Sequence, residues 1–171
     1  FDHSVSFKTY WDVNSGIENP PTVLEFETFE AIRTGGHHLN LLTIEFVLNS
    51  DSLFSIFAGL DAHHGAEIYV GEDLVYSEFR DLWWSNNWQN KSVIEMSDTL
   101  LYEGRNAIKI FWAESCCNGP NSVMFAIDNE APLYLNESTL ELATAEVSDP
   151  TNIALLGLGL FGLMGLTIRK K

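Results

Sequence analysis

The chain has 171 residues and a formal net charge of −15, with 46% hydrophobic and 12% aromatic residues. This length allows one ordinary domain with an appendage, and the hydrophobic content is sufficient for a folded core. The last three residues, Arg169, Lys170 and Lys171, are basic, so the chain before them is more negative still. A surface of that sign repels phosphate backbones, so we expect no nucleic acid partner.

Apolar and polar residues alternate through most of the chain, which is the pattern of strands with one buried face. The alternation predicts strands over residues 4–11, 24–29, 40–48, 53–60, 66–70, 106–112 and 122–127. The predicted inward faces carry Val5, Phe7 and Trp11; Leu24 and Phe26; Leu42, Ile44, Phe46 and Leu48; Phe54, Ile56 and Ala58; and Ile108, Ile110 and Trp112. Residues 1–135 are therefore predicted to be an all-β, antiparallel, jelly-roll-like β-sandwich, with no helix before the C-terminal tail.

Residues 55–128 also have a recognisable order. Asp61 ends one strand, a tight turn follows at residues 71–73, and the element "LYEGRN" (residues 101–106) leads into another strand. This order resembles the galactose-binding-like and PA14-like sandwiches, which often accompany glycan-active or surface proteins. The resemblance implies the sandwich fold, and many members of such folds bind no sugar.

Two histidine pairs, His37–His38 and His63–His64, raise the question of a metal site, with Asp61 and Glu67 near the second pair in sequence. Zinc needs three or four converging ligands, and adjacent residues of a strand point to opposite faces. We favour loop histidines on a polar rim. Calcium suits an acidic chain better, but no repeated aspartate loop is present. We expect neither a metal nor another cofactor.

The segment "LWWSNNWQN" places Trp83, Trp84 and Trp88 among amide side chains. Indoles stack on sugar rings and amides bond their hydroxyls, so these tryptophans and Asp61 are candidate glycan-binding residues. The alternative, which we favour slightly, is that the indoles close the end of the sandwich. The chain has no Gly-x-Ser-x-Gly element and no phosphate-binding glycine loop, so we expect no catalytic residues and no enzyme.

The two cysteines, Cys116 and Cys117, are adjacent in "SCCNGPNS". Neighbouring cysteines can close a small disulfide ring, and the following Asn-Gly-Pro is turn chemistry that tolerates an unusual backbone. The sequence leaves three arrangements open: a vicinal disulfide, two free thiols, or a bridge to another chain.

Residues 136–148 are predicted to be a polar linker, and residues 149–171 are predicted to be a distinct tail. Residues 153–168 contain no charge and would span about 24 Å as a helix, slightly less than a bilayer core of about 30 Å. Snorkelling basic side chains can close that difference. The basic end is expected in the cytoplasm and the body outside. A buried core helix is the alternative, but so small a protein cannot cover a helix that is apolar all round.

This tail resembles the PEP-CTERM sorting signals of exopolysaccharide-producing bacteria, which exosortases recognise. Such signals consist of Pro-Glu-Pro, an apolar span rich in Leu and Gly, and a basic end. The chain has Ser148-Asp149-Pro150, then "ALLGLGL" at residues 154–160 and "RKK" at the end, with serine in place of the first proline. "CCNG" also matches the CCXG group of these proteins, which has no assigned activity.

The resemblance implies an exported protein of the cell surface or extracellular matrix. The body would be held at the inner membrane by the tail until an exosortase-like membrane enzyme processes it. Its expected partners are that enzyme, the membrane and exopolysaccharide. Export would place the cysteines in an oxidising compartment.

Overall fold

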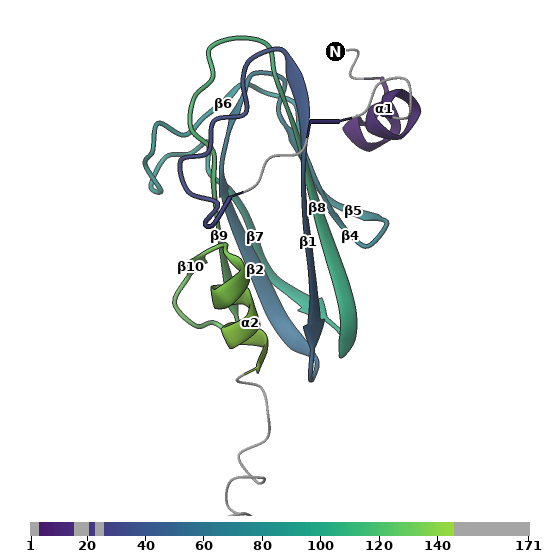
Figure 1. Cartoon of the computed structure of the whole chain (residues 1–171), viewed down its shortest axis with the longest axis vertical. Coiled ribbons are helices and arrows are strands. Elements are labelled where there is room, and N and C mark those ends of the chain that lie inside the picture. Colours follow the sequence, from purple (N-terminus) through teal and green to yellow (C-terminus); the bar gives the residue numbers. More distant parts are fainter. Residues whose placement is uncertain (1–3, 16–20, 23–25, 146–171) are drawn as a thin grey trace, which may run out of the picture.

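The computed structural model describes residues 4–15, 21–22 and 26–145, which form two packed antiparallel sheets (Figure 1). The first sheet has the order β1 (His38–Leu48), β8 (Gly104–Glu114), β4 (Ala66–Val70), β5 (Asp73–Glu78). The second has the order β10 (Leu133–Tyr134), β9 (Ser122–Ile127), β2 (Ser52–Gly59), β7 (Ile94–Leu101). A two-stranded ribbon, β3 (Asp61–Ala62) and β6 (Leu82–Trp83), lies at one end. The predicted all-β sandwich is confirmed.

The core lies between the two sheets, and alternation along β1 and β2 turns every second residue toward it. The inward residues predicted for β1, β2 and β8 are all buried: Leu42, Ile44, Phe46, Leu48, Phe54, Ile56, Ala58, Ile108, Ile110 and Trp112. Phe54 of β2 stacks on Phe46 of the opposite sheet at 5.0 Å and on Phe125 of its own sheet at 5.7 Å. Burial of each large apolar side chain stabilises the fold by roughly 1.5–3 kcal/mol.

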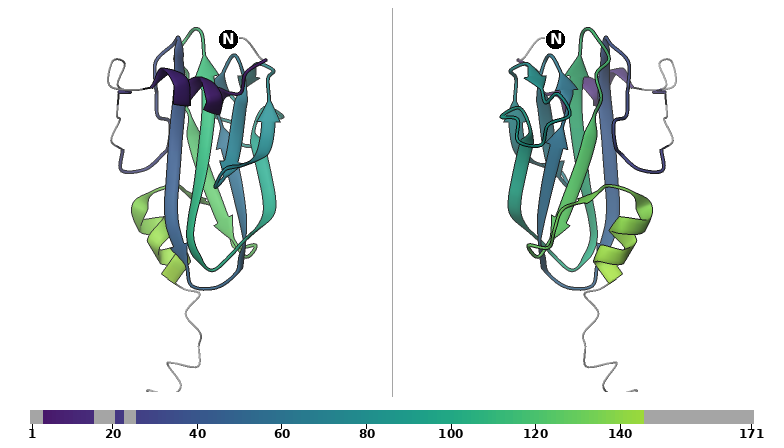
Figure 2. Two further views of the ribbon diagram at one scale, coloured as in Figure 1. Left: turned by 90° about the vertical axis from the view of Figure 1, so that its right-hand side faces the viewer. Right: turned by 90° about the vertical axis from the view of Figure 1, so that its left-hand side faces the viewer.

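The predicted strand at residues 4–11 is wrong, because the chain forms α1 (Phe7–Asn14) there. Ser6 caps the helix by accepting a hydrogen bond from the Thr9 backbone N–H at 3.1 Å. Phe7 and Trp11 are four residues apart and therefore share one helix face. That face packs on Tyr69 and Phe111 of the first sheet. The helix thus lies across the outer face of that sheet (Figure 2).

Charged side chains also tie α1 to the sheet. Lys8 forms ion pairs with Asp12 at 2.8 Å and with Glu72 at 3.1 Å, and Lys109 of β8 reaches Glu72 at 3.0 Å. The two lysines lower the pKa of Glu72.

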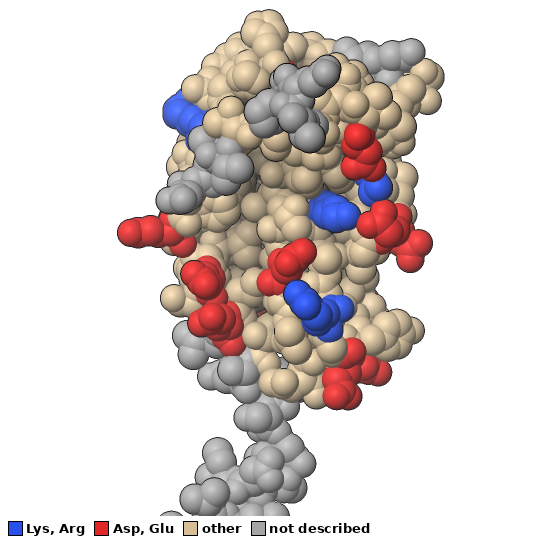
Figure 3. All heavy atoms as spheres, turned by 45° about the vertical axis from the view of Figure 1, so that its right-hand side comes forward, with Lys and Arg blue, Asp and Glu red and all other residues tan. Residues whose placement is uncertain are grey.

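The face turned forward in Figure 3 carries basic and acidic side chains interspersed, with no large patch of one sign.

The predicted strand over residues 24–29 lies partly outside the described residues, and from residue 26 onward the chain forms bends instead. Phe29 still reaches the core, where its ring meets Trp112 edge-on at 6.2 Å. Its backbone bridges two segments, donating to Leu135 at 2.8 Å and accepting from Val123 at 3.0 Å. A single aromatic anchor therefore replaces the expected strand.

The expectation of no helix before the tail is also wrong at a second place, since α2 (Glu137–Ala145) occupies most of the predicted linker. Asn136 caps it by accepting the Thr139 backbone N–H at 2.7 Å. Leu140 and Ala143, three residues apart, pack against the core of the sandwich. The helix α2 is therefore packed on the sandwich through Leu140 and Ala143.

Among the described residues, no helix is long and apolar enough to cross a membrane. The expected helix at residues 153–168, and the sorting residues Ser148, Asp149, Pro150, Arg169, Lys170 and Lys171, lie outside them.

Candidate functional site

The loop that joins β8 to β9 carries the two cysteines. It lies at the end of the sandwich where the ribbon of β3 and β6 is found (Figure 1). We call residues 115–121 the CCNG loop. Cys116 and Cys117 form a disulfide, with their Cα atoms 3.7 Å apart, so the structure has the vicinal bridge. Both residues are exposed. Cys117 and Asn118 have φ angles of 79° and 77°, a left-handed backbone that costs an L-residue roughly 1–2 kcal/mol.

Glu114, the last residue of β8, anchors the start of this loop. Its carboxylate is 3% exposed and accepts backbone N–H bonds from His63 at 3.0 Å, Ser115 at 2.8 Å and Cys116 at 2.7 Å. Three such donors satisfy a carboxylate that burial would otherwise destabilise. We did not predict this residue. The available signal was an acid ending the apolar run "IFWAE".

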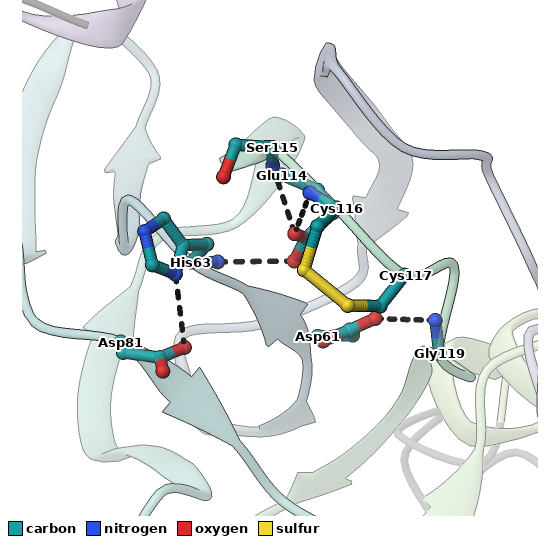
Figure 4. The surroundings of a disulfide bond; sticks show 8 residues. All are labelled: Asp61, His63, Asp81, Glu114, Ser115, Cys116, Cys117 and Gly119. Atoms are coloured by element: carbon teal, nitrogen blue, oxygen red, sulfur yellow. Dashed lines mark hydrogen bonds and ion pairs between the residues drawn. A yellow bond between two sulfur atoms is a disulfide. The ribbon is translucent and has the colours of Figure 1, made fainter.

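Asp61 anchors the other end of the loop (Figure 4). Its carboxylate is 6% exposed and accepts the Gly119 backbone N–H, and its own N–H donates to Asn121 Oδ1 at 2.9 Å. Burial raises the pKa of Asp61, the Gly119 hydrogen bond opposes this, and the negative charges of Glu114 and Asp81 raise it further. Asp61 is therefore a structural carboxylate that faces the loop.

Gly119 is placed where no side chain fits. A Cβ atom there would lie 2.4 Å from Asp61 Oδ2 and 2.5 Å from Trp83 Cζ3. The glycine that follows the cysteines by two positions therefore lets the loop backbone approach Asp61 and the indole of Trp83. That indole remains 48% exposed.

The other two predicted tryptophans have structural roles. Trp84 is 3% exposed, and its Nε1 donates to the Pro120 carbonyl at 2.7 Å. Trp88 packs on Trp84 with ring centroids 4.8 Å apart and donates from Nε1 to Tyr134 at 3.2 Å. Of the four predicted glycan-binding residues, only Trp83 therefore offers a large exposed surface.

The segment before β1 holds the loop from a third side. Asn118 Oδ1 accepts the Gly35 backbone N–H at 2.8 Å, and the Asn118 carbonyl accepts a hydrogen bond from Arg33 Nη1. Asn121 pairs with Ile32 through a backbone bridge. Asn118 and Asn121, which we did not predict, thus connect the loop to residues 32–35.

The second histidine pair lies in a turn and does not converge with Asp61 and Glu67 on a metal site. The rings of His63 and His64 are 4.9 Å apart, and His63 Nδ1 lies 3.9 Å from Asp81 Oδ1. Glu67 instead lies under α1, where it accepts from Tyr69 Oη at 3.0 Å. Within residues 4–15, 21–22 and 26–145, no three potential ligands form a group suited to a metal ion.

A cavity of about 910 Å³ lies elsewhere, between α1, the chain before β1 and β1 itself. Tyr10, Trp11 and His38 are among its lining residues. Neither Asp61, Trp83 nor the cysteines are among the described residues that line it. We place the candidate site at the CCNG loop because, among the residues that the structure describes, it is there that buried carboxylates, a disulfide and an exposed indole meet.

No family model, curated protein or solved structure matches the chain. Both buried carboxylates are bonded to backbone N–H groups of the loop, which suits a structural role better than proton transfer. The groups that face solvent include the Trp83 indole, the disulfide and the side chains of Arg33, His63 and Asp81. The indole can stack on the ring of a ligand, and the disulfide can undergo exchange with a thiol.

Proposed function

We propose that this chain is an exported, non-enzymatic bacterial protein of the cell surface or extracellular matrix, sorted through its tail by an exosortase-like enzyme. The carrying observation is the order of the tail: Ser148-Asp149-Pro150, an uncharged run over residues 153–168, and three basic residues. A disulfide on the surface agrees with export, because cytosolic thiols are kept reduced. The strand order of the two sheets agrees with a jelly-roll-like sandwich as the exported body.

The test is fractionation of a host that carries the sorting enzyme. Arg169, Lys170 and Lys171 are replaced together by glutamate, and the mass and location of the protein are compared with the original. The original should appear outside the cell without its tail, whereas the variant should be retained or mislocalised.

A matched control replaces Arg80, Lys91 and Arg105, three exposed basic residues of the body, by glutamate. It changes the net charge by the same amount and should be sorted normally. Equal sorting of the tail variant and the original would refute the proposal, as would a full-length mass found only in membranes.

A second candidate function is carbohydrate binding by the body. The observation that favours it is Trp83, whose half-exposed indole lies against Gly119 at the end of the sandwich. Aromatic faces of this kind supply stacking area, and neighbouring polar groups supply orientation. Asp61 would take part indirectly, by fixing Gly119 beneath the indole, while Trp84 and Trp88 would hold the loop that carries Trp83.

Binding of exopolysaccharide from the host is the test, with Trp83→Ala compared with Tyr102→Ala. Tyr102 is 67% exposed and follows β7, at the opposite end of the sandwich, so it controls for loss of any exposed aromatic side chain. Trp83→Ala should abolish binding and Tyr102→Ala should preserve it. Equal binding by both variants would remove this candidate.

A further inference from the structure

We propose that the Cys116–Cys117 disulfide is a reversible thiol-exchange site, whose reaction with a small dithiol or a dithiol-bearing protein releases the CCNG loop from its two buried carboxylates. This goes beyond the proposed sorting and binding functions. It rests on the exposure of the disulfide, the backbone that it encloses and the hydrogen bonds on either side of it.

The first observation is access. Cys116 and Cys117 are both exposed, whereas Glu114 and Gly119, two positions away on either side, are buried. Exchange requires a thiolate to approach one sulfur atom, so exposure separates labile disulfides from buried structural ones. The bond also joins neighbouring residues, so it cross-links no distant parts of the chain. Its loss leaves both sheets and their core intact.

The second observation is the backbone that the small ring encloses. Cys117 and Asn118 both have positive φ, at 79° and 77°. The pairs Ser85–Asn86 and Asp128–Asn129 have the same backbone in loops without a disulfide. In the CCNG loop, hydrogen bonds from Gly35 and Arg33 hold Asn118, whereas the small ring itself constrains Cys117. When the ring opens, the constraint on Cys117 is lost and the chain relaxes toward negative φ.

The third observation is what this backbone positions. On one side of the ring, the N–H groups of Ser115 and Cys116 point at Glu114. On the other side, the Gly119 N–H points at Asp61. A relaxed loop withdraws donors from two buried carboxylates at once. It also moves the backbone that supports Trp83, so the exposed surface of the loop changes with the state of the cysteines.

The exchange balances as two displacements. A thiolate of the dithiol attacks the Sγ of one cysteine, the S–S bond breaks, and the other cysteine leaves as a thiolate and is protonated. The second thiolate of the dithiol attacks the mixed disulfide and releases the first cysteine, which is also protonated. Two electrons pass to the protein, and the dithiol becomes a disulfide.

The experiment uses the full chain with dithiothreitol as the probe. Alkylation and intact mass count the thiols, and hydrogen exchange follows the backbone amides of Cys116 and Gly119. Reduction should yield two thiols per chain and accelerate exchange at these amides by at least about tenfold, reversibly on reoxidation. The Gly71 amide, which donates to Ala107 in a distant turn, is the internal control and should not change.

A double variant, Cys116→Ser with Cys117→Ser, should exchange rapidly at Gly119 with or without dithiothreitol. If this variant fails to fold, the hydrogen exchange of the wild-type chain with and without dithiothreitol still tests the proposal. Two thiols with unchanged protection of Gly119 would overturn the proposal, as would a disulfide that resists dithiothreitol while the protein is folded. No carbohydrate or membrane is used, so neither outcome depends on the proposed function.

Discussion

Replacement of Gly119 by alanine is the sharpest test of the candidate site. The added Cβ would meet Asp61 Oδ2 at 2.4 Å and Trp83 Cζ3 at 2.5 Å, so at least one side chain must move. Asp61 is buried and accepts the Gly119 N–H, so movement there breaks a charged hydrogen bond. Loss of that bond costs about 1–3 kcal/mol, and overpacking adds about 1–3 kcal/mol. Since partial relaxation reduces both, we expect Gly119→Ala to lower the free energy of unfolding by about 2–4 kcal/mol.

Denaturant unfolding followed by circular dichroism measures this loss, and the melting temperature should fall by roughly 5–15 °C. Gly71→Ala is the comparison, because nothing lies within 4 Å of a Cβ there and φ is 60°. That variant should lose only about 1–2 kcal/mol, from the left-handed backbone alone. A Gly119→Ala variant that loses less than the Gly71→Ala variant would refute the close approach of the loop to Asp61 and Trp83.

Three further outcomes follow from individual contacts. Trp84→Phe removes the bond to the Pro120 carbonyl and should cost about 1–3 kcal/mol, whereas Trp83→Phe should stay within about 0.5 kcal/mol; equal losses would contradict the different roles of the two indoles. Burial and the neighbouring Glu114 raise the pKa of Asp61 above 3.8, so its contribution to stability is complete below that pH and is lost as the pH rises through the folded pKa. Asp61→Asn should therefore flatten the stability profile on the alkaline side of pH 3.8, and an unchanged profile would assign the dependence to another group. Phe7→Ala should weaken the docking of α1 by about 3 kcal/mol, seen as faster hydrogen exchange in α1 with β2 and β9 unaffected; unchanged protection of α1 would mean that other contacts hold it.

The sandwich was predictable because period-two alternation directly encodes a strand with one buried face. In β1, β2 and β8 every predicted inward residue is buried, as the core between the sheets requires. The two helices were missed because their signals are short. Each rests on one cap, Ser6 or Asn136, and on one pair of apolar residues at helical spacing. In windows this short, strand and helix periods are difficult to distinguish.

The candidate site was predicted only in part. Asp61, Trp83 and the cysteines stand out in the sequence through residue type, but Glu114 and Asn121 do not, because their importance comes from the backbone groups that they meet. Trp83 and Trp84 are neighbours in sequence and opposite in exposure, at 48% and 3%. Trp83 ends β6 and Trp84 is the residue that follows the strand, and only the packing of β6 and the CCNG loop at the end of the sandwich decides which of the two indoles is covered.

The sequence by itself thus determined the fold class, the alternating core and the order of the C-terminal tail, because these depend on local patterns of residue type. The tertiary structure decided which residues form the CCNG loop site. Asp61 and Gly119 are 58 positions apart in the chain, and their hydrogen bond exists only because β3 and the β8–β9 loop meet at one end of the sandwich. No local pattern encodes such a meeting, since it follows from how the two sheets pack and connect.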